Sequence, residues 1–218
     1  MRAPDDKQVH GEVRELERRV IAMGNMVESL FADSVMALIE SSPGMVPGMR
    51  AEDCRAHEQW LEVDKLCIEL LTAGQLEADQ IRFVWAAARI ATDLKRTADE
   101  SLRIGEALRS CVPEYPSMSK PLASVPRLAE LTQSMLGDAL DAFVNRDAVQ
   151  AGALHLVFRE LASQTAQTVK AITQGLTTSE IAAPLGAACL GVAQRLQRIG
   201  DEVLDISNQV SHLHRHTQ

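Results

Sequence analysis

Apolar residues recur in the first part of the chain with spacings that alternate between three and four residues. The run consists of Val13, Leu16, Val20, Met23, Val27, Leu30 and Ala37, with Ser34 filling one step. This seven-residue period, kept over almost four heptads, is typical of a long helix whose apolar seam packs in a bundle. The segment 43–48 holds two prolines and two glycines and predicts the loop that ends the helix.

Similar apolar stripes predict five further helices. Their expected ranges are 53–73, 79–110, 127–145, 147–176 and 184–213. Gly74 follows the second range directly, and glycine is the common residue just beyond a helix end because it adopts the left-handed conformation. No segment shows the period-two alternation of a strand.

Residues 111–126 contain four prolines and divide the predicted helices into two groups of three. Proline breaks helices, so this segment is expected to be a linker. The fold class is therefore expected to be all-α, with one three-helix bundle in residues 1–110 and a second in residues 127–218.

An internal repeat indicates that the two groups are related. Leu94–Ile104 aligns without gaps on Leu196–Ile206, and six of the eleven positions are identical: Leu, Arg, Asp, Glu, Leu and Ile. Both copies lie in the third helix of their group. Because three of the identities are charged residues, which amphipathic patterning does not dictate, the two bundles are expected to be pseudo-symmetric.

Composition narrows the class of protein. The net charge is −8, with 22 basic and 30 acidic residues, whereas a nucleic-acid binder is expected to carry a basic surface. Aromatic residues make up only 3% of the chain, which argues against aromatic stacking surfaces. The four cysteines are scattered and form no Cys-x-x-Cys pair, so neither a structural zinc site nor a disulfide framework is expected.

Targeting and membrane signals are not evident in the sequence. The first twelve residues contain Asp5, Asp6 and Lys7 and lack the apolar stretch of a signal peptide. The longest uncharged and mostly apolar run, 181–193, is shorter than the roughly 20 residues that a membrane-spanning helix needs. We expect a cytoplasmic protein that reaches a membrane only through its partners.

Carboxylates on the long helices are the main candidates for chemistry. Asp99 and Asp201 occupy equivalent positions of the repeat, Asp205 follows Asp201 by one helical turn, and Asp64 lies beside an apolar seam. A carboxylate near a core must be paired, protonated or bound to a metal. Ion pairing with Arg96 or Arg198, metal coordination and solvent exposure all remain open for these residues.

Motifs for catalysis are not found. The chain has no Gly-x-Ser-x-Gly, no phosphate-binding glycine loop and no His-Glu-x-x-His. A carboxylate-bridged di-metal enzyme would need Glu-x-x-His pairs on facing helices, and that ligand set is also missing. The protein is therefore expected not to be an enzyme.

Small residues gather at the start of the last helix and allow another helix to approach closely. They are Ala182, Ala183, Gly186, Ala187, Ala188 and Gly191. Internal packing and the face of a homodimer both remain open as explanations.

The repeated Leu-x-Arg-x-x-Asp, complete as Arg198-Ile199-Gly200-Asp201, closely resembles the signature of the PhoU family. Weaker matches follow in the order that the family shows. They are Met23-Gly24, Asp64-x-Leu66-x-x-Glu69, Asp79-x-x-Arg82, and Ala139-Leu140-Asp141-Ala142-Phe143 with Arg146-Asp147. The resemblance covers nearly the whole chain and implies two tandem three-helix bundles.

The resemblance also implies a function. PhoU proteins are regulators that couple the ATPase of the phosphate ABC transporter to a sensor histidine kinase and repress the phosphate-starvation response. The alternative is a divergent PhoU paralogue that lacks the metal cluster and serves a different transporter or signalling partner.

A multinuclear iron or zinc cluster is part of what the resemblance implies, and the sequence departs from it. In the family, a carboxylate four residues before the motif Asp helps bind the metal; here Lys95 and Gln197 stand at those places. A lysine repels a cation, so the first cluster is expected to be lost. A single divalent or ferric ion remains possible at the second copy of the motif. The candidate metal ligands are Asp201, Asp205, Asp99 and Asp64.

Overall fold

The computed structural model of the chain describes residues 6–40, 42–107 and 124–214. These residues form six α-helices and a short 3-10 turn, and they contain no strand, so the expected all-α class is confirmed. The elements are α1 (Asp6–Glu40), η1 (Pro43–Met45), α2 (Val46–Ala73), α3 (Ala78–Ala107), α4 (Val125–Asn145), α5 (Ala148–Thr177) and α6 (Ala183–His214).

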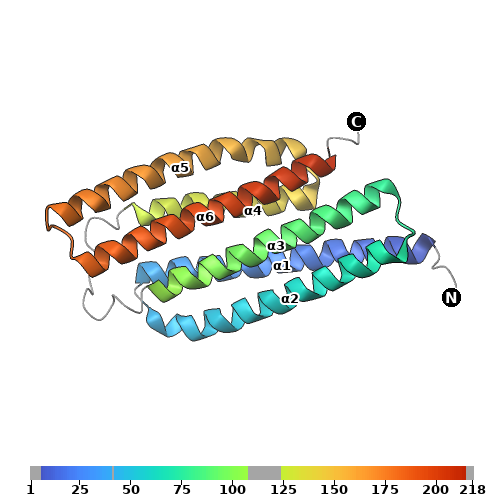
Figure 1. The fold of residues 1–218 in the computed structure, drawn as a ribbon, viewed down its shortest axis with the longest axis horizontal. Coiled ribbons are helices and arrows are strands. Elements are labelled where there is room, and N and C mark those ends of the chain that lie inside the picture. Colours follow the sequence, from blue (N-terminus) through green and yellow to red (C-terminus); the bar gives the residue numbers. More distant parts are fainter. Residues whose placement is uncertain (1–5, 41, 108–123, 215–218) are drawn as a thin grey trace.

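The helices form two bundles of three that lie side by side along their length (Figure 1). Helices α1, α2 and α3 pack on one another, as do α4, α5 and α6. Helices α3 and α6 run along each other between the bundles, and α1 also contacts α4. The expectation of two tandem three-helix bundles is confirmed, and the two copies of the repeat lie on the two helices that join them.

The bounds of two helices differ from the expected ranges because a proline begins the helix instead of preventing it. Helix α2 starts at Val46 rather than at residue 53, with Pro47 in its first turn. Helix α4 starts at Val125, with Pro126 in the same place. A proline costs little there because the first backbone N–H groups of a helix have no intrahelical partner. Most of the expected linker, 111–126, lies outside the described residues.

The apolar periods account for the core. In α1, Leu16, Val20 and Met23 are completely buried. The buried Ser34 donates a hydrogen bond from its hydroxyl to the carbonyl oxygen of Phe31, at 2.7 Å. It therefore fits the apolar face of α1 without leaving a polar group unpaired. The expected stop at Gly74 is confirmed by its left-handed φ of 69°.

Helix α1 has one property that the search for uncharged runs missed. Among the described residues, its segment Val9–Glu40 is long and apolar enough to cross a membrane. Half of its most apolar window is buried inside the molecule, however. The core helix of a bundle shows the same combination of length and apolar character.

Gly200, in the second copy of the repeat, marks a close approach between α6 and α5. A methyl group at this position would collide with the buried side chain of Leu161. We expect Gly200→Ala to lower the free energy of unfolding by about 1–3 kcal/mol, because the packed core has no room for the added carbon. Chemical denaturation of the purified variant measures this change.

Gly191, in the same helix, provides the matched control. A methyl group at this position meets no atom within 4 Å. Gly191→Ala is therefore expected to raise the free energy of unfolding by about 0.5–1 kcal/mol, since alanine loses less backbone entropy on folding. Equal effects of the two substitutions would contradict the packing that we describe.

Candidate functional site

The two copies of the repeat face each other across α3 and α6 and form reciprocal ion pairs. Arg96 on α3 donates to a carboxylate oxygen of Glu202 on α6, at 3.3 Å. Arg198 on α6 donates to a carboxylate oxygen of Glu100 on α3, at 3.4 Å. Arg96 and Arg198 are equivalent in the repeat, as are Glu100 and Glu202. The repeated Arg and Glu therefore join the two bundles, and we call this contact the seam.

At one end of the seam, three arginines surround a single buried carboxylate. Arg195 and Arg103 each donate to Glu100 at 2.8 Å, in addition to Arg198. Burial alone raises the pKa of the Glu100 carboxyl, but the hydrogen bond and charge of Arg195, together with Arg103, lower that pKa below its ordinary value. Glu100 is therefore held ionised between the bundles.

At the other end, three carboxylates lie close together and a single arginine pairs with two of them. Ligand oxygens of Asp93, Glu202 and Asp205 all lie within 4.8 Å of one another. Arg96 lies 3.5 Å from Asp93 and is the cation of the group. Burial, followed by the charges of Glu202 and Asp205, raises the pKa of the Asp93 carboxyl to about 7. The side chain of Glu202 thus favours the protonated form of Asp93, while the charge of Arg96 opposes it.

The two ends differ because the repeat carries opposite charges at two equivalent positions. Asp93 of the first copy corresponds to Arg195 of the second, and Arg103 corresponds to Asp205. The exchange of sign leaves one end of the seam rich in positive charge and the other rich in negative charge. Two pseudo-equivalent sites thus have opposite electrostatic character.

Asp99, the motif Asp of the first copy, is not part of the seam and pairs with a lysine on its own helix. Lys95, one turn earlier on α3, contacts both of its carboxylate oxygens, at 2.5 and 2.6 Å. Asp53 of α2 lies close by: its burial, followed by the charge of Asp99, raises the pKa of its carboxyl, and Lys95 and His57 oppose that rise. The ammonium group of Lys95 contacts Asp99 directly, and the charge of Arg103 also acts on Asp53.

Asp201, the motif Asp of the second copy, is exposed and accepts a hydrogen bond from Gln197. Partial desolvation raises the pKa of its carboxyl, the hydrogen bond from Gln197 lowers it, and Asp205 adds to the rise. On α5, Glu160 is engaged elsewhere, because it accepts from Gln164 at 2.9 Å and pairs with Arg127 of α4 at 3.6 Å.

Asp64 is exposed on α2, where its charge contributes to the raised pKa of the buried Cys67. Trp60 of α2 lies opposite Thr92 of α3, to which it donates a hydrogen bond at 3.4 Å. Because the two helices run antiparallel, Asp64 and Asp99 extend from this point in opposite directions. About three helical turns, or roughly 16 Å along the axis, separate them. The structure therefore does not bring these two candidates together.

These surroundings do not fit the multinuclear metal cluster that the resemblance implies. At the first copy, the positive charge of Lys95 is bound directly to the motif carboxylate. At the second copy, Gln197 presents its amide N–H to Asp201, and Asp205 is the carboxylate whose charge acts on it. Within the described ranges, the one trio of carboxylates close enough to share an ion belongs to the seam, and there Arg96 is already paired with two of the three.

The sequence analysis offered Arg96 and Arg198 as ion-pair partners of the candidate aspartates. In the structure they pair with other carboxylates, namely Asp93, Glu202 and Glu100. Glu100 and Glu202 occupy equivalent positions of the repeat, and this identity could have indicated that they are the partners of the repeated arginines. Asp93 gave no signal, because its counterpart in the second copy is an arginine.

Some of the small residues at the start of α6 pack inside the molecule, and others are exposed to solvent. Gly186 is buried, and a methyl group there would collide with Leu176 of α5. Ala183 and Ala187 are exposed. Internal packing thus explains part of the stripe, and the homodimer remains a prediction.

Comparison with known proteins places these observations in a family. The sequence model of the PhoU domain family matches the chain twice, at residues 20–108 and 125–210. A relative from Pseudomonas putida, described as a phosphate-specific transport system accessory protein PhoU homolog, is 26% identical over 97% of this chain and 82% of its own length. The corresponding protein of Caulobacter vibrioides is 28% identical over 90% of this chain and 85% of its own length.

Solved structures show the same fold. The crystal structure of PhoU from Pseudomonas aeruginosa superimposes with a TM-score of 0.91 at 23% identity, over 95% of this chain and 99% of that one. The crystal structure of the phosphate transport system regulatory protein PhoU from Streptococcus pneumoniae gives a TM-score of 0.87 at 21% identity, with 95% and 97% of the two chains covered.

Proposed function

Because the chain belongs to the PhoU family, we propose that it is an accessory regulator of a phosphate transport system. The observation that carries this proposal is the match of the family's domain to both halves of the chain. The curated relatives named as accessory proteins of that system align with 90% or more of this chain, which supports it.

The finer proposal is that the protein acts as a helical adapter without catalytic activity of its own. It would contact the ATPase of a phosphate ABC transporter and a sensor histidine kinase on the cytoplasmic side of the membrane. In that position it would repress the phosphate-starvation response when phosphate is plentiful. The proposal requires no metal, in keeping with the surroundings of Asp99 and Asp201.

An exposed apolar face on the first bundle suits the contact with the ATPase. Cys67 of α2 meets the backbone of Val84 of α3, at 3.7 Å. On two antiparallel helices, the next residues, Ile68 and Trp85, then emerge on the same outer side. Trp85 is 61% exposed and Ile68 54% exposed. Large exposed aromatic residues are common anchors of protein interfaces.

Complementation of a deletion strain tests the proposal. Deleting the gene is expected to leave phosphate-starvation genes expressed in medium rich in phosphate, and the wild-type gene should restore repression. Trp85→Ala should restore it less well, because it removes the proposed anchor. The matched control is Leu156→Ala, which truncates a side chain of equal exposure on α5 and should restore repression completely. Unchanged expression on deletion would overturn the proposed function.

The alternative of a divergent paralogue is favoured by one observation, the ion pair that binds Lys95 to the motif carboxylate. Affinity capture with the purified transporter ATPase and with the kinase separates the two proposals. Recovery of neither protein would favour a paralogue that serves another transporter or sensor.

A further inference from the structure

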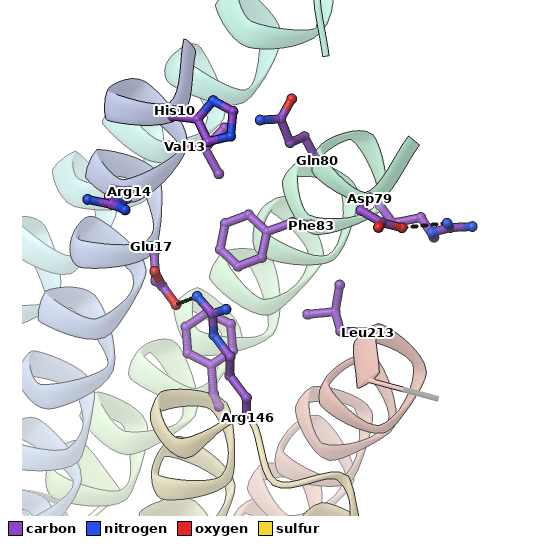
Figure 2. A pocket seen from close by; sticks show the side chains of 11 residues that line it. His10, Val13, Arg14, Glu17, Asp79, Gln80, Phe83, Arg146 and Leu213 are labelled. Atoms are coloured by element: carbon purple, nitrogen blue, oxygen red, sulfur yellow. Dashed lines mark hydrogen bonds and ion pairs between the residues drawn. The ribbon is translucent and has the colours of Figure 1, made fainter. Parts of the chain in front are cut away.

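A cavity of about 360 Å³ opens at the end of the molecule where α1 and α3 begin and α4 and α6 end. Its walls come from both bundles, as Figure 2 shows. The volume lies in the range of sites for small molecules. None of the seam residues lines it, so the cavity is separate from the site described above.

Two phenylalanines, one from each bundle, form the apolar side of this cavity. Phe83 of α3 and Phe143 of α4 are stacked with their ring centroids 6.2 Å apart and their planes 15° from parallel. Phe143 is buried, whereas Phe83 is only partly buried and points into the cavity (Figure 2). A planar apolar group would therefore meet the ring of Phe83.

The charged side of the cavity has one positive charge without a counter-charge. Arg146 is paired with Glu17 at 3.0 Å, and Arg82 is paired with Asp79 at 2.6 Å. Arg14, from α1, has no ion-pair partner in the part of the chain that the structure describes. Because both acidic residues of the lining are already paired, Arg14 is available to an anion.

The walls are held in place before any ligand arrives. Arg146 caps α4 in the left-handed conformation, with a φ of 56°, and its backbone N–H bonds to the carbonyl oxygens of Ala142 and Phe143. Its guanidinium is held by Glu17, which belongs to the other bundle. A preformed site loses less free energy to ordering when it binds.

We propose that this cavity binds a small aromatic monoanion, with its ring against Phe83 and its carboxylate at Arg14. One uncompensated arginine matches one negative charge, so a monoanion suits the site better than a dianion. Two sources share this chemistry: a free aromatic acid and the C-terminal aromatic residue of a polypeptide. Both of the proposed contacts come from the first bundle, and the second bundle contributes Phe143, Arg146 and Leu213 to the walls.

Calorimetric titration with two related compounds tests the proposal. N-acetylphenylalanine carries both the ring and the carboxylate, and N-acetylphenylalaninamide carries the ring alone. We expect the acid to bind the wild-type protein with one-to-one stoichiometry and at least ten times more tightly than the amide. Inorganic phosphate, which lacks the ring, should not compete.

Variants locate the binding. Arg14→Ala should lower the affinity for N-acetylphenylalanine at least tenfold. The control Arg18→Ala, one turn further along α1 and outside the cavity, should change that affinity less than twofold. Phe83→Leu, with the helical circular dichroism of the wild type as the check on its fold, should lower the affinity for both compounds. Equal affinity for acid and amide, an unchanged Arg14→Ala variant, or no binding at millimolar concentrations would each overturn the proposal.

A third compound distinguishes the sources. Phenylpropionate has the ring and the carboxylate but lacks the acetylated amino group that imitates a chain end. Tighter binding of N-acetylphenylalanine would assign the cavity to a polypeptide terminus. Equal or tighter binding of phenylpropionate would assign it to a free acid.

Discussion

Replacing Glu100 by glutamine is expected to lower the free energy of unfolding at neutral pH by about 3 kcal/mol. The substitution keeps the shape of the side chain but removes the negative charge that holds Arg195, Arg103 and Arg198 together. Removing one partner of a buried ion pair commonly lowers the free energy of unfolding by about 3–5 kcal/mol. Because these arginines are partly exposed, we expect a value at the lower end of that range. Urea denaturation followed by circular dichroism measures the change.

Glu202→Gln is the matched control, because Glu202 holds the equivalent position in the second copy. It loses the pair with Arg96 but relieves the repulsion from Asp93 and Asp205, so we expect a change of no more than about 1 kcal/mol. Similar losses in the two variants would contradict the opposite electrostatic character of the two ends of the seam.

Asp93→Asn is expected to make the protein more stable than the wild type at pH 8, and this advantage should shrink steadily as the pH falls toward 3.8. The folded protein keeps a proton on Asp93 up to a pKa of about 7, whereas the unfolded chain releases it near 3.8. Between these values the native state binds more protons, so the contribution of Asp93 to stability falls as the pH rises. Asparagine has no proton to lose and avoids this fall.

The advantage of the variant at pH 8 is expected to exceed its advantage below pH 4 by about 4 kcal/mol, since the pKa shift is about three units and each unit corresponds to about 1.4 kcal/mol. The quantity to compare is the difference between variant and wild type across the pH range, because other titrating groups cancel in it. Asp141→Asn, at an exposed position on α4, is the control for removal of a carboxylate elsewhere in the molecule. A difference for Asp93→Asn that does not change between pH 4 and pH 8 would show that the carboxyl is ionised throughout.

The fold was largely predictable because its main determinants are local. Heptad spacing in α1 and the glycine after α2 each act within a few residues, and the structure confirms both. The start of α2 was not predicted, because Pro47 breaks a helix or begins it depending on where the first turn falls. Sequence alone does not distinguish these two positions.

The candidate site was predictable only in part. The repeat drew attention to the correct stretch of α3 and α6, and Arg96 and Arg198 do form internal ion pairs. Which residue pairs with which depends on how the two helices face each other, and periodicity within one helix contains no information about that. Asp93 and Asp53 became apparent only when their neighbours on other helices were in place.

The exposure of Trp85 has a practical consequence for studies of this protein in solution. The chain has only two tryptophans, and both lie in the first bundle. Trp60 is partly buried and hydrogen-bonded, while Trp85 is largely in contact with water. Intrinsic fluorescence would therefore report any covering of the α2 and α3 face as a shift to shorter emission wavelength, without an added dye. Trp85→Phe would supply the spectrum of Trp60 alone.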